Sequence, residues 1–204
     1  MTAISDPASI IQWAVRGRPI EGCPESGDLH IVAPFEGGAL VGIIDGLGHG
    51  PEAAVAARAG ADALRLDPAQ PVLRLIEACH RSVRATRGLV LSLASIDAIR
   101  GEVSWAGVGN VEAVIFPPGE DRPRDRIVPR NGVVGYRLPP MRAVTLPIAP
   151  GSTIVFGSDG LRHDFVDRVA AEDLESAADY LLETFGKIDD DATVLLVRYW
   201  GLRS

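Results

Sequence analysis

Hydrophobic residues alternate with polar or small residues in several short segments of the chain, and this pattern predicts β-strands. The segments 28–34 and 38–45 flank Glu36-Gly37-Gly38, whose composition is typical of a turn, so an antiparallel hairpin is expected there. Three further segments are separated by Arg100-Gly101 and Gly109-Asn110, which predicts a three-stranded meander. Strands are predicted at residues 10–16, 28–34, 38–45, 89–99, 102–108, 111–116, 143–148, 152–160 and 192–200.

The hydrophobic period changes to that of a helix in three places. Pro51 stands at a favourable first position and is followed by the alanine-rich segment 52–66. Segment 71–87 carries apolar residues on one helical face, and segment 173–186 is rich in good helix formers. Because hairpins join consecutive strands and the helices form two groups, we predict an α+β fold of mostly antiparallel sheet, with sheet packed on sheet and helices outside.

Composition narrows the class of protein. The chain has 204 residues, 47% of them hydrophobic and 23% charged, as in one globular domain spanning residues 1–204. A net charge of −7 and a pI near 5.1 argue against nucleic acid as the main partner. Lys187 is the only lysine, and the stretch from Arg122 to Arg126 reads as a solvated loop.

The sequence also predicts the cellular compartment of the protein. The first residues have no positively charged head and no sustained apolar segment, so neither a signal peptide nor an anchor is predicted, and no run is long enough to span a bilayer. Two cysteines, Cys23 and Cys79, do not form a close pair, which argues against a disulfide framework or a zinc site. We therefore expect no membrane association and a cytoplasmic location.

Aspartates recur beside small residues where predicted strands begin or end. They occur in SGD (Asp28), IIDG (Asp45), GSDG (Asp159) and DDDAT (Asp189 to Asp191). Several carboxylates cannot share a small volume without a cation, and a hard divalent ion such as Mg²⁺ or Mn²⁺ accepts oxygen ligands. The carbonyl of Gly46 adds a further candidate oxygen. Taken singly, each aspartate is also a normal turn residue, so only the joint pattern indicates a metal site.

The histidines have less specific patterns. His49 lies four residues after Asp45, and it either donates to a phosphate or acts as a general acid, or it only orients the loop. His30 in a strand and His80 on a helix are interpreted as structural or surface residues. His163 is close to GSDG in sequence and is interpreted as a capping or packing residue.

In their order and separation, the acidic motifs resemble those of the SpoIIE-type branch of the PPM metal-dependent serine/threonine protein phosphatases. The motifs that carry the resemblance are ESGD (25–28), DGLGHG (45–50), SDG (158–160) and DDAT (190–193), with ASID and AGVGN in the middle strands. The resemblance extends from about Trp13 to Tyr199. It implies an α-β-β-α sandwich that holds two Mn²⁺ or Mg²⁺ ions at the edge where both sheets meet.

Carried over residue by residue, the resemblance implies specific roles. Asp45 would bridge the two ions, and the carbonyl of Gly46 would bind one of them. Asp159 and Asp190 would bind the other ion, and Asp28 would be a ligand directly or through water. Asp190 is preferred to its neighbours because it is the first aspartate of the D-D-x-T pattern.

Two departures from the family pattern affect other residues. The eukaryotic-type members carry a phosphate-binding arginine just before the first acidic motif, whereas GCPES here has none, and Arg16 and Arg18 are only nearby candidates. Those members also carry DGHGG, so a general-acid role does not transfer to His49.

Only 27 residues precede Asp28, which leaves no room for a sensor region and resembles the free-standing RsbX-type stressosome phosphatases. The expected partners are therefore phosphorylated STAS-domain proteins of a bacterial stressosome. An alternative within the class is a SpoIIE- or RsbU-like phosphatase of an anti-anti-sigma factor. From other classes, GLGHG faintly imitates a dinucleotide-binding loop, although the third glycine comes too early and hairpins surround it. A catalytically inactive interaction domain is a further alternative.

Overall fold

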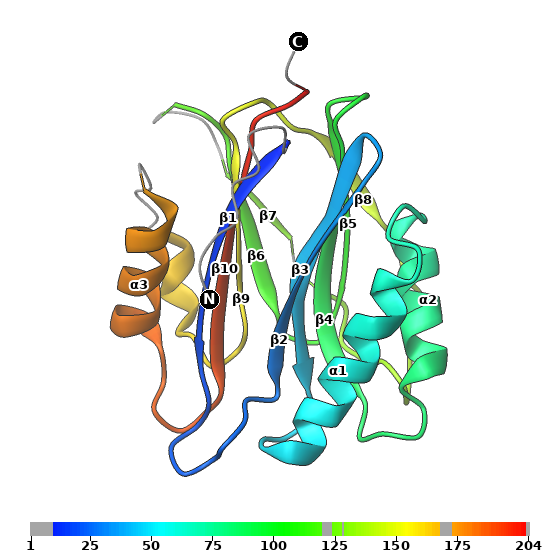
Figure 1. Cartoon of the computed structure of the whole chain (residues 1–204), viewed down its shortest axis with the longest axis vertical. Coiled ribbons are helices and arrows are strands. Elements are labelled where there is room, and N and C mark those ends of the chain that lie inside the picture. Colours follow the sequence, from blue (N-terminus) through cyan, green and yellow to red (C-terminus); the bar gives the residue numbers. More distant parts are fainter. Residues whose placement is uncertain (1–9, 120–123, 128, 168–172, 203–204) are drawn as a thin grey trace.

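The computed structural model describes residues 10–119, 124–127, 129–167 and 173–202. Two five-stranded sheets lie face to face, with α3 outside one and α1 and α2 outside the other (Figure 1). The first sheet, called the β1 sheet, has the order β1 (Ile11–Arg18), β10 (Ala192–Tyr199), β9 (Thr153–Gly157), β6 (Glu112–Phe116) and β7 (Asp125–Ile127). The second, called the β2 sheet, has the order β2 (Asp28–Phe35), β3 (Gly38–Gly46), β4 (Leu89–Asp97), β5 (Glu102–Val108) and β8 (Val144–Pro147). The helices are α1 (Pro51–Arg65), α2 (Val72–Ser82), η1 (His163–Asp167), a short 3₁₀ helix, and α3 (Leu174–Phe185). The predicted α+β sandwich with outer helices is confirmed.

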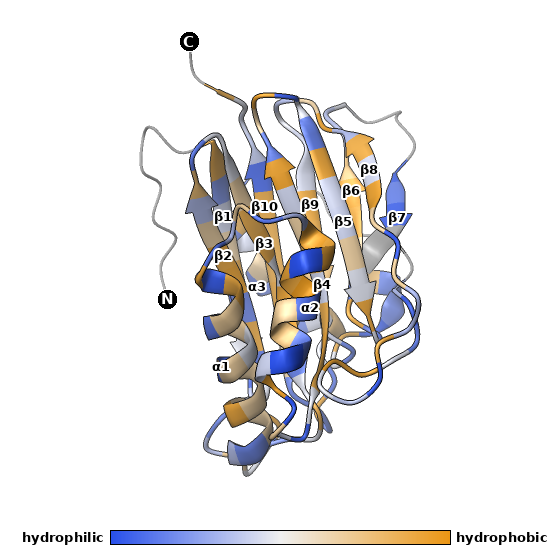
Figure 2. Ribbon diagram, turned by 90° about the vertical axis from the view of Figure 1, so that its right-hand side faces the viewer, coloured by the Kyte–Doolittle hydropathy of each residue, from blue (hydrophilic) through white to orange (hydrophobic). Residues whose placement is uncertain are grey.

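Three apolar layers hold these elements together. The central layer lies between the sheets and includes Trp105 and Phe156, whose rings are 5.8 Å apart. A second layer packs α1 and α2 on the β2 sheet, and a third packs α3 on the β1 sheet. Figure 2 shows the matching pattern, with hydrophobic residues concentrated along the strands and polar residues in the loops. The central strands of each sheet therefore bury both of their faces. This explains the long apolar runs in these strands.

Small residues let α1 approach the β2 sheet closely. Its buried positions are alanines and a glycine as well as Leu64, so the helix presents little side-chain volume to the sheet. At the closest point, a Cβ atom on Gly46 would lie 2.1 Å from the carbonyl oxygen of Ala53. The alanine-rich segment is thus a helix whose small face fits against the end of β3.

The second helix is shorter than its apolar pattern predicts. We expected helix over 71–87, but α2 ends at Ser82 and residues 83–88 form turns. Thr86 Oγ1 donates to the carbonyl of Val83 at 2.7 Å and accepts from Gly88 N at 3.1 Å. Gly88 has a φ of 83°, a conformation that favours glycine. These local bonds replace the last helical turn and direct the chain into β4.

The predicted meander of residues 89–116 is wrong in its last strand. β4 and β5 pair as expected, but β6 belongs to the other sheet, where it pairs with β9 and β7. The turn at Gly109-Asn110 is therefore a crossover between sheets. The free edge of β5 is taken by β8, which lies more than 30 residues later, so local sequence alone could not reveal the pairing.

The segment 117–130, whose Pro/Arg-rich composition indicates a loop, also contains a short strand. Residues 125–127 form β7 at the edge of the β1 sheet, which the Pro/Arg-rich composition concealed. Residues 120–123 and 128 of that loop lie outside the described residues, as does the N-terminal segment 1–9. None of the helices in the described ranges combines the length and hydropathy needed to cross a membrane.

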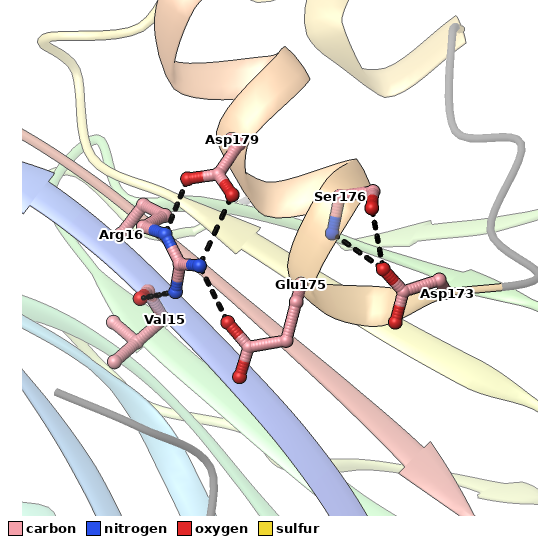
Figure 3. A network of polar contacts seen from close by, with 6 residues as sticks. All are labelled: Val15, Arg16, Asp173, Glu175, Ser176 and Asp179. Carbon is pink, nitrogen blue, oxygen red and sulfur yellow. Dashed lines mark hydrogen bonds and ion pairs between the residues drawn. The ribbon is translucent and has the colours of Figure 1, made fainter.

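A polar network attaches α3 to β1 (Figure 3). Nη2 of Arg16 lies 3.1 Å from Asp179 Oδ2 and 2.5 Å from Glu175 Oε2, and the Arg16 Nε also pairs with Asp179. At the start of the helix, Asp173 accepts from the backbone N–H of Ser176 at 2.9 Å. This N-cap bond explains why the helix begins at Leu174. The hydroxyl of Ser176 also donates to Asp173, and this bond, followed by the N-cap bond, lowers the pKa of Asp173.

Candidate metal centre

The four acidic motifs meet at one edge of the sandwich. Asp28 begins β2 and lies directly opposite Asp45, near the end of β3. Asp159 follows β9 and Asp190 precedes β10, and these two strands are neighbours in the other sheet. A cavity of about 420 Å³ opens between the two pairs. Its walls are Asp45, Leu47, Gly48, His49, Val90, Gly109, Asn110, Asn131, Gly132, Asp159 and Asp190.

The carboxyl groups of Asp28 and Asp45 are largely removed from solvent. Asp28 is only 6% exposed, and its Oδ2 atom is buried without a hydrogen-bond partner. Burial raises the pKa of Asp28 to about 7. Burial, followed by the negative charge of Asp28 and of the other aspartates, raises the pKa of Asp45 to about 9. Without a cation, the protein therefore disfavours ionisation of both groups.

Glycines shape the loop between Asp45 and α1. Gly48 and Gly50 have φ values of 86° and 74°, so both positions require a left-handed backbone. Gly50 is the N-cap residue of α1, and Pro51 follows at the first helical position. Position 46 requires glycine because a side chain there would collide with the backbone of Ala53. Its N–H donates to the carbonyl of Gly27 at 3.0 Å, which ties DGLGHG to ESGD.

The three consecutive aspartates of DDDAT have different environments. Asp189 is exposed, whereas Asp190 is partly buried and lines the cavity. Asp191 is buried, and its two oxygens accept the backbone N–H groups of Ile20 and Gly27, each at 2.7 Å. Burial and the charge of Asp159 raise the pKa of Asp190. The preference for Asp190 as the ligand is therefore consistent with its place, and Asp191 has a structural function.

Removing the carboxylate of Asp191 is expected to destabilise the fold. The change Asp191→Ala leaves the buried N–H of Gly27 and the partly buried N–H of Ile20 without acceptors, each having lost a hydrogen bond to a charged group, and should cost about 3 kcal/mol. Urea unfolding of the metal-free protein measures this loss. Asp189→Ala, at the exposed neighbour, should change the free energy of unfolding by less than about 0.5 kcal/mol. Equal losses for the two variants would contradict the structural role of Asp191.

Asp159 is held from two sides by groups that we did not predict. Asn110 Nδ2 donates to Asp159 Oδ2 at 2.5 Å, from the crossover between the sheets. Lys187 Nζ donates to the backbone oxygen of Asp159 at 2.5 Å. Asn110 and Asn131 each stand next to a glycine, as Asp28, Asp45 and Asp159 do, so the sequence contained a signal for both asparagines. They were not predicted because only carboxylates were considered as ligands.

Of the four histidines, His49 lines the cavity in the structure. His49 is exposed and lines the cavity, with its Nδ1 3.5 Å from Cys23 Sγ. His163 is exposed, pairs with Glu112 and is not part of the cavity wall. His30 and His80 lie elsewhere, in contact with Trp13 and Gly135 N.

Neither arginine considered from the sequence reaches into the cavity. Arg16 is engaged by Asp179 and Glu175 on the outer face, where α3 packs. Arg18 donates to the backbone oxygen of Lys187 at 2.8 Å. Both guanidinium groups therefore have structural partners.

The donor set fits a hard divalent cation. It consists of carboxylate oxygens from both sheets, and the buried oxygen of Asp28 that has no hydrogen-bond partner is one that a cation would satisfy. The raised pKa of Asp45 agrees with this, because a cation would favour its ionised form. In the part of the chain that the structure describes, no three His, Cys, Asp or Glu side chains converge as a complete ligand set. Mg²⁺ commonly binds through one or two carboxylates and keeps several waters, so the arrangement suits it.

Comparisons with known proteins agree with this geometry. Residues 36–200 match the family model described as Stage II sporulation protein E (SpoIIE). A structure from work on the bacterial stressosome, as a modular system adapted to control secondary messenger signalling, is 26% identical with a TM-score of 0.84, covering 92% of this chain and 99% of that one. RsbX in complex with magnesium is 21% identical with a TM-score of 0.84, covering 97% of this chain and 98% of that one.

A third structure is the PP2C phosphatase domain and a regulatory fragment of SpoIIE from Bacillus subtilis. It is 20% identical with a TM-score of 0.76, and the match covers 94% of this chain and 62% of that one. A comparison with curated protein sequences finds no significant match.

Proposed function

The chain belongs to the SpoIIE family of PPM-type serine/threonine protein phosphatases, and we propose that it dephosphorylates STAS-domain regulators of a bacterial stress-signalling pathway. The observation that carries the proposal is the meeting of Asp45 from one sheet with Asp159 and Asp190 from the other in the wall of a cavity large enough for a phosphorylated side chain. The buried Asp28 lies directly opposite Asp45. The dinucleotide-loop interpretation of GLGHG is wrong, because every ladder between the described strands is antiparallel.

We propose five ligands for two ions, Mn²⁺ or Mg²⁺. They are the carboxylates of Asp28, Asp45, Asp159 and Asp190 and the carbonyl of Gly46, with Asp45 shared between the ions. Such ions lower the pKa of a bound water towards 7, from about 15.7 in bulk, and offset charge on phosphoryl oxygens. When bound, ions held by these residues would supply an activated water for hydrolysis of the phosphate ester, so no residue of the chain would need to become phosphorylated.

The other residues of the cavity position these groups. Asn110 fixes one oxygen of Asp159 and leaves the second for an ion, while Lys187 restrains the backbone of the same residue. Leu47 and Val90 supply an apolar wall that limits access of water. His49, exposed at the rim, is placed to donate a proton to a leaving oxygen.

The choice of substrate rests on the compared structures. The stressosome-associated structure covers this chain almost end to end, as does RsbX. A structure with RsbU and RsbW domains from Mycobacterium tuberculosis is also similar, at 20% identity and a TM-score of 0.78, which keeps the anti-anti-sigma type of STAS substrate as the alternative. We place the reaction in the cytoplasm, in keeping with two unpaired cysteines, Cys23 and Cys79.

Phosphorylated STAS-domain proteins test this proposal directly. A stressosome-type protein and an anti-anti-sigma factor are each incubated with the enzyme and Mn²⁺, and loss of phosphate is followed by intact mass. Phosphorylated casein serves as the control substrate. The proposal expects faster release from the stressosome-type protein than from casein. Turnover of p-nitrophenyl phosphate without release from either STAS protein would contradict it, and an inactive interaction domain would turn over neither.

A further inference from the structure

The wall of the cavity lacks a positively charged side chain of its own. In the described part of the chain it contains three carboxylates, two asparagines, a histidine, glycines and apolar residues, but no lysine or arginine. A phosphate dianion that enters between carboxylates needs hydrogen-bond donors as well as ions, and guanidinium is well suited because it can bind two phosphate oxygens at once. Positively charged side chains just outside the cavity wall are therefore candidates for binding the phosphate.

Arg87 lies against the loop that follows Asp45. Its Nη1 atom is 3.0 Å from the position that a Cβ atom would take on Gly48, and Gly48 is part of the cavity wall. A side chain at position 48 would crowd the guanidinium in this position. We propose that Arg87 binds the phosphate group of the substrate at the rim of this cavity. The proposal rests on the phosphatase function and does not depend on which phosphoprotein is used.

The backbone around Arg87 is fixed to the site. The N–H of Leu47 donates to the carbonyl of Gly88 at 3.1 Å, so the turn that carries Arg87 is bonded to the DGLGHG loop. On its other side, Leu89 and Val134 exchange two backbone hydrogen bonds, of 3.0 and 2.8 Å. The guanidinium thus extends from a turn whose backbone is held by Leu47, in the cavity wall, and on its other side by Val134.

The present partner of Arg87 is easily exchanged. Nη2 pairs with Glu52, in the first turn of α1, and the side chains are 52% and 69% exposed. An ion pair in such contact with water contributes little to stability, whereas a phosphate held beside metal ions offers a doubly charged, bidentate acceptor. Glu52 therefore keeps the guanidinium near Gly48 until a phosphate replaces it.

Two other nearby cations, Lys187 and Arg18, are committed elsewhere. Lys187 Nζ donates to the backbone oxygen of Asp159, and Arg18 donates to the backbone oxygen of Lys187. Moving either group toward a substrate would break a bond that supports a proposed metal ligand. Arg87 can turn toward phosphate at the cost of one exposed ion pair.

The test compares Arg87→Gln with Arg74→Gln. Arg74 is a matched control because it is also exposed and pairs with a glutamate, Glu77, but on α2 away from the cavity. In Arg87→Gln, the KM for p-nitrophenyl phosphate and the competitive inhibition constant of inorganic phosphate should both rise about tenfold, as expected for loss of a charged hydrogen bond. Arg87→Lys should restore part of the affinity, and the Mn²⁺ concentration for half-maximal activity should stay unchanged.

A readout independent of turnover accompanies the kinetics. In Mn²⁺, inorganic phosphate should raise the melting temperature of the wild type and of Arg74→Gln, and this rise should be lost in Arg87→Gln. An unchanged inhibition constant and thermal shift would overturn the proposal. So would a parallel change in the Mn²⁺ requirement, because Arg87 would then act through the metal site. Failure on STAS proteins alone would refute the proposed substrate and leave this inference standing.

Discussion

Replacing Asp45 with asparagine is expected to reduce Mn²⁺-dependent hydrolysis of p-nitrophenyl phosphate by on the order of a thousandfold. Asparagine keeps the shape of the side chain but removes the charge that we assign to both ions. The fold should survive, because burial already raises the pKa of Asp45 to about 9 and the neutral form is therefore the favoured one without metal. Hydrolysis rates with Mn²⁺ and with EDTA give the measurement.

The neighbouring aspartates provide the controls for this prediction. Asp190→Asn should also lose most activity, whereas Asp189→Asn, at an exposed position, should retain it. Melting temperatures in EDTA show whether each variant is folded. Full activity of a folded Asp45→Asn protein would rule out the proposed metal site, and loss of activity in Asp189→Asn would rule out the assignment within DDDAT.

The metal-free protein should lose stability as pH rises. Asp28 and Asp45 have pKa values of about 7 and about 9 in the folded protein, above the ordinary value of 3.8. Between these limits the folded state holds more protons than the unfolded state, so the free energy of unfolding decreases with pH. The stabilising contribution is complete below about pH 4 and is lost as pH passes through 7 and then 9.

Thermal unfolding in EDTA from pH 5.5 to pH 9 measures this effect. Each proton of difference lowers the free energy of unfolding by up to about 1.4 kcal/mol per pH unit. Asp45→Asn should flatten the profile, because it removes the group with the higher pKa. Mn²⁺ should reverse the loss in the wild type and bind more tightly at higher pH, since its ligands must be deprotonated. A wild-type melting temperature that rises towards pH 9 in EDTA would contradict the electrostatics of the site.

Local signals in the sequence were sufficient for most elements and for the acidic residues of the site. Turn chemistry and apolar alternation predicted the β2–β3 hairpin, whose register then brings Asp28 opposite Asp45. A sequence pattern cannot show which distant strand fills a sheet edge, and this is why β6 was assigned to the wrong sheet. The same limit concealed Asn110, whose role depends on the crossover that brings it to Asp159.

Some groups at the site have a physical role that the sequence does not indicate. The backbone of Ala53 requires glycine at position 46, independently of the ligand role proposed for the Gly46 carbonyl. Among three adjacent aspartates, only the folded structure shows that Asp191 caps two backbone N–H groups. Arg87 is not part of a motif, and its position beside Gly48 arises from packing between a turn and a loop that are 39 residues apart in sequence.

The most direct test of the metal centre is anomalous diffraction from crystals grown or soaked with Mn²⁺. We expect two manganese peaks at the edge where both sheets meet, with the carboxylate of Asp45 bound to both and Asp190 bound to one. Crystals of Asp45→Asn in the same solution should lose at least one peak. Manganese peaks found only elsewhere on the protein, in crystals of the active enzyme, would contradict the proposed centre.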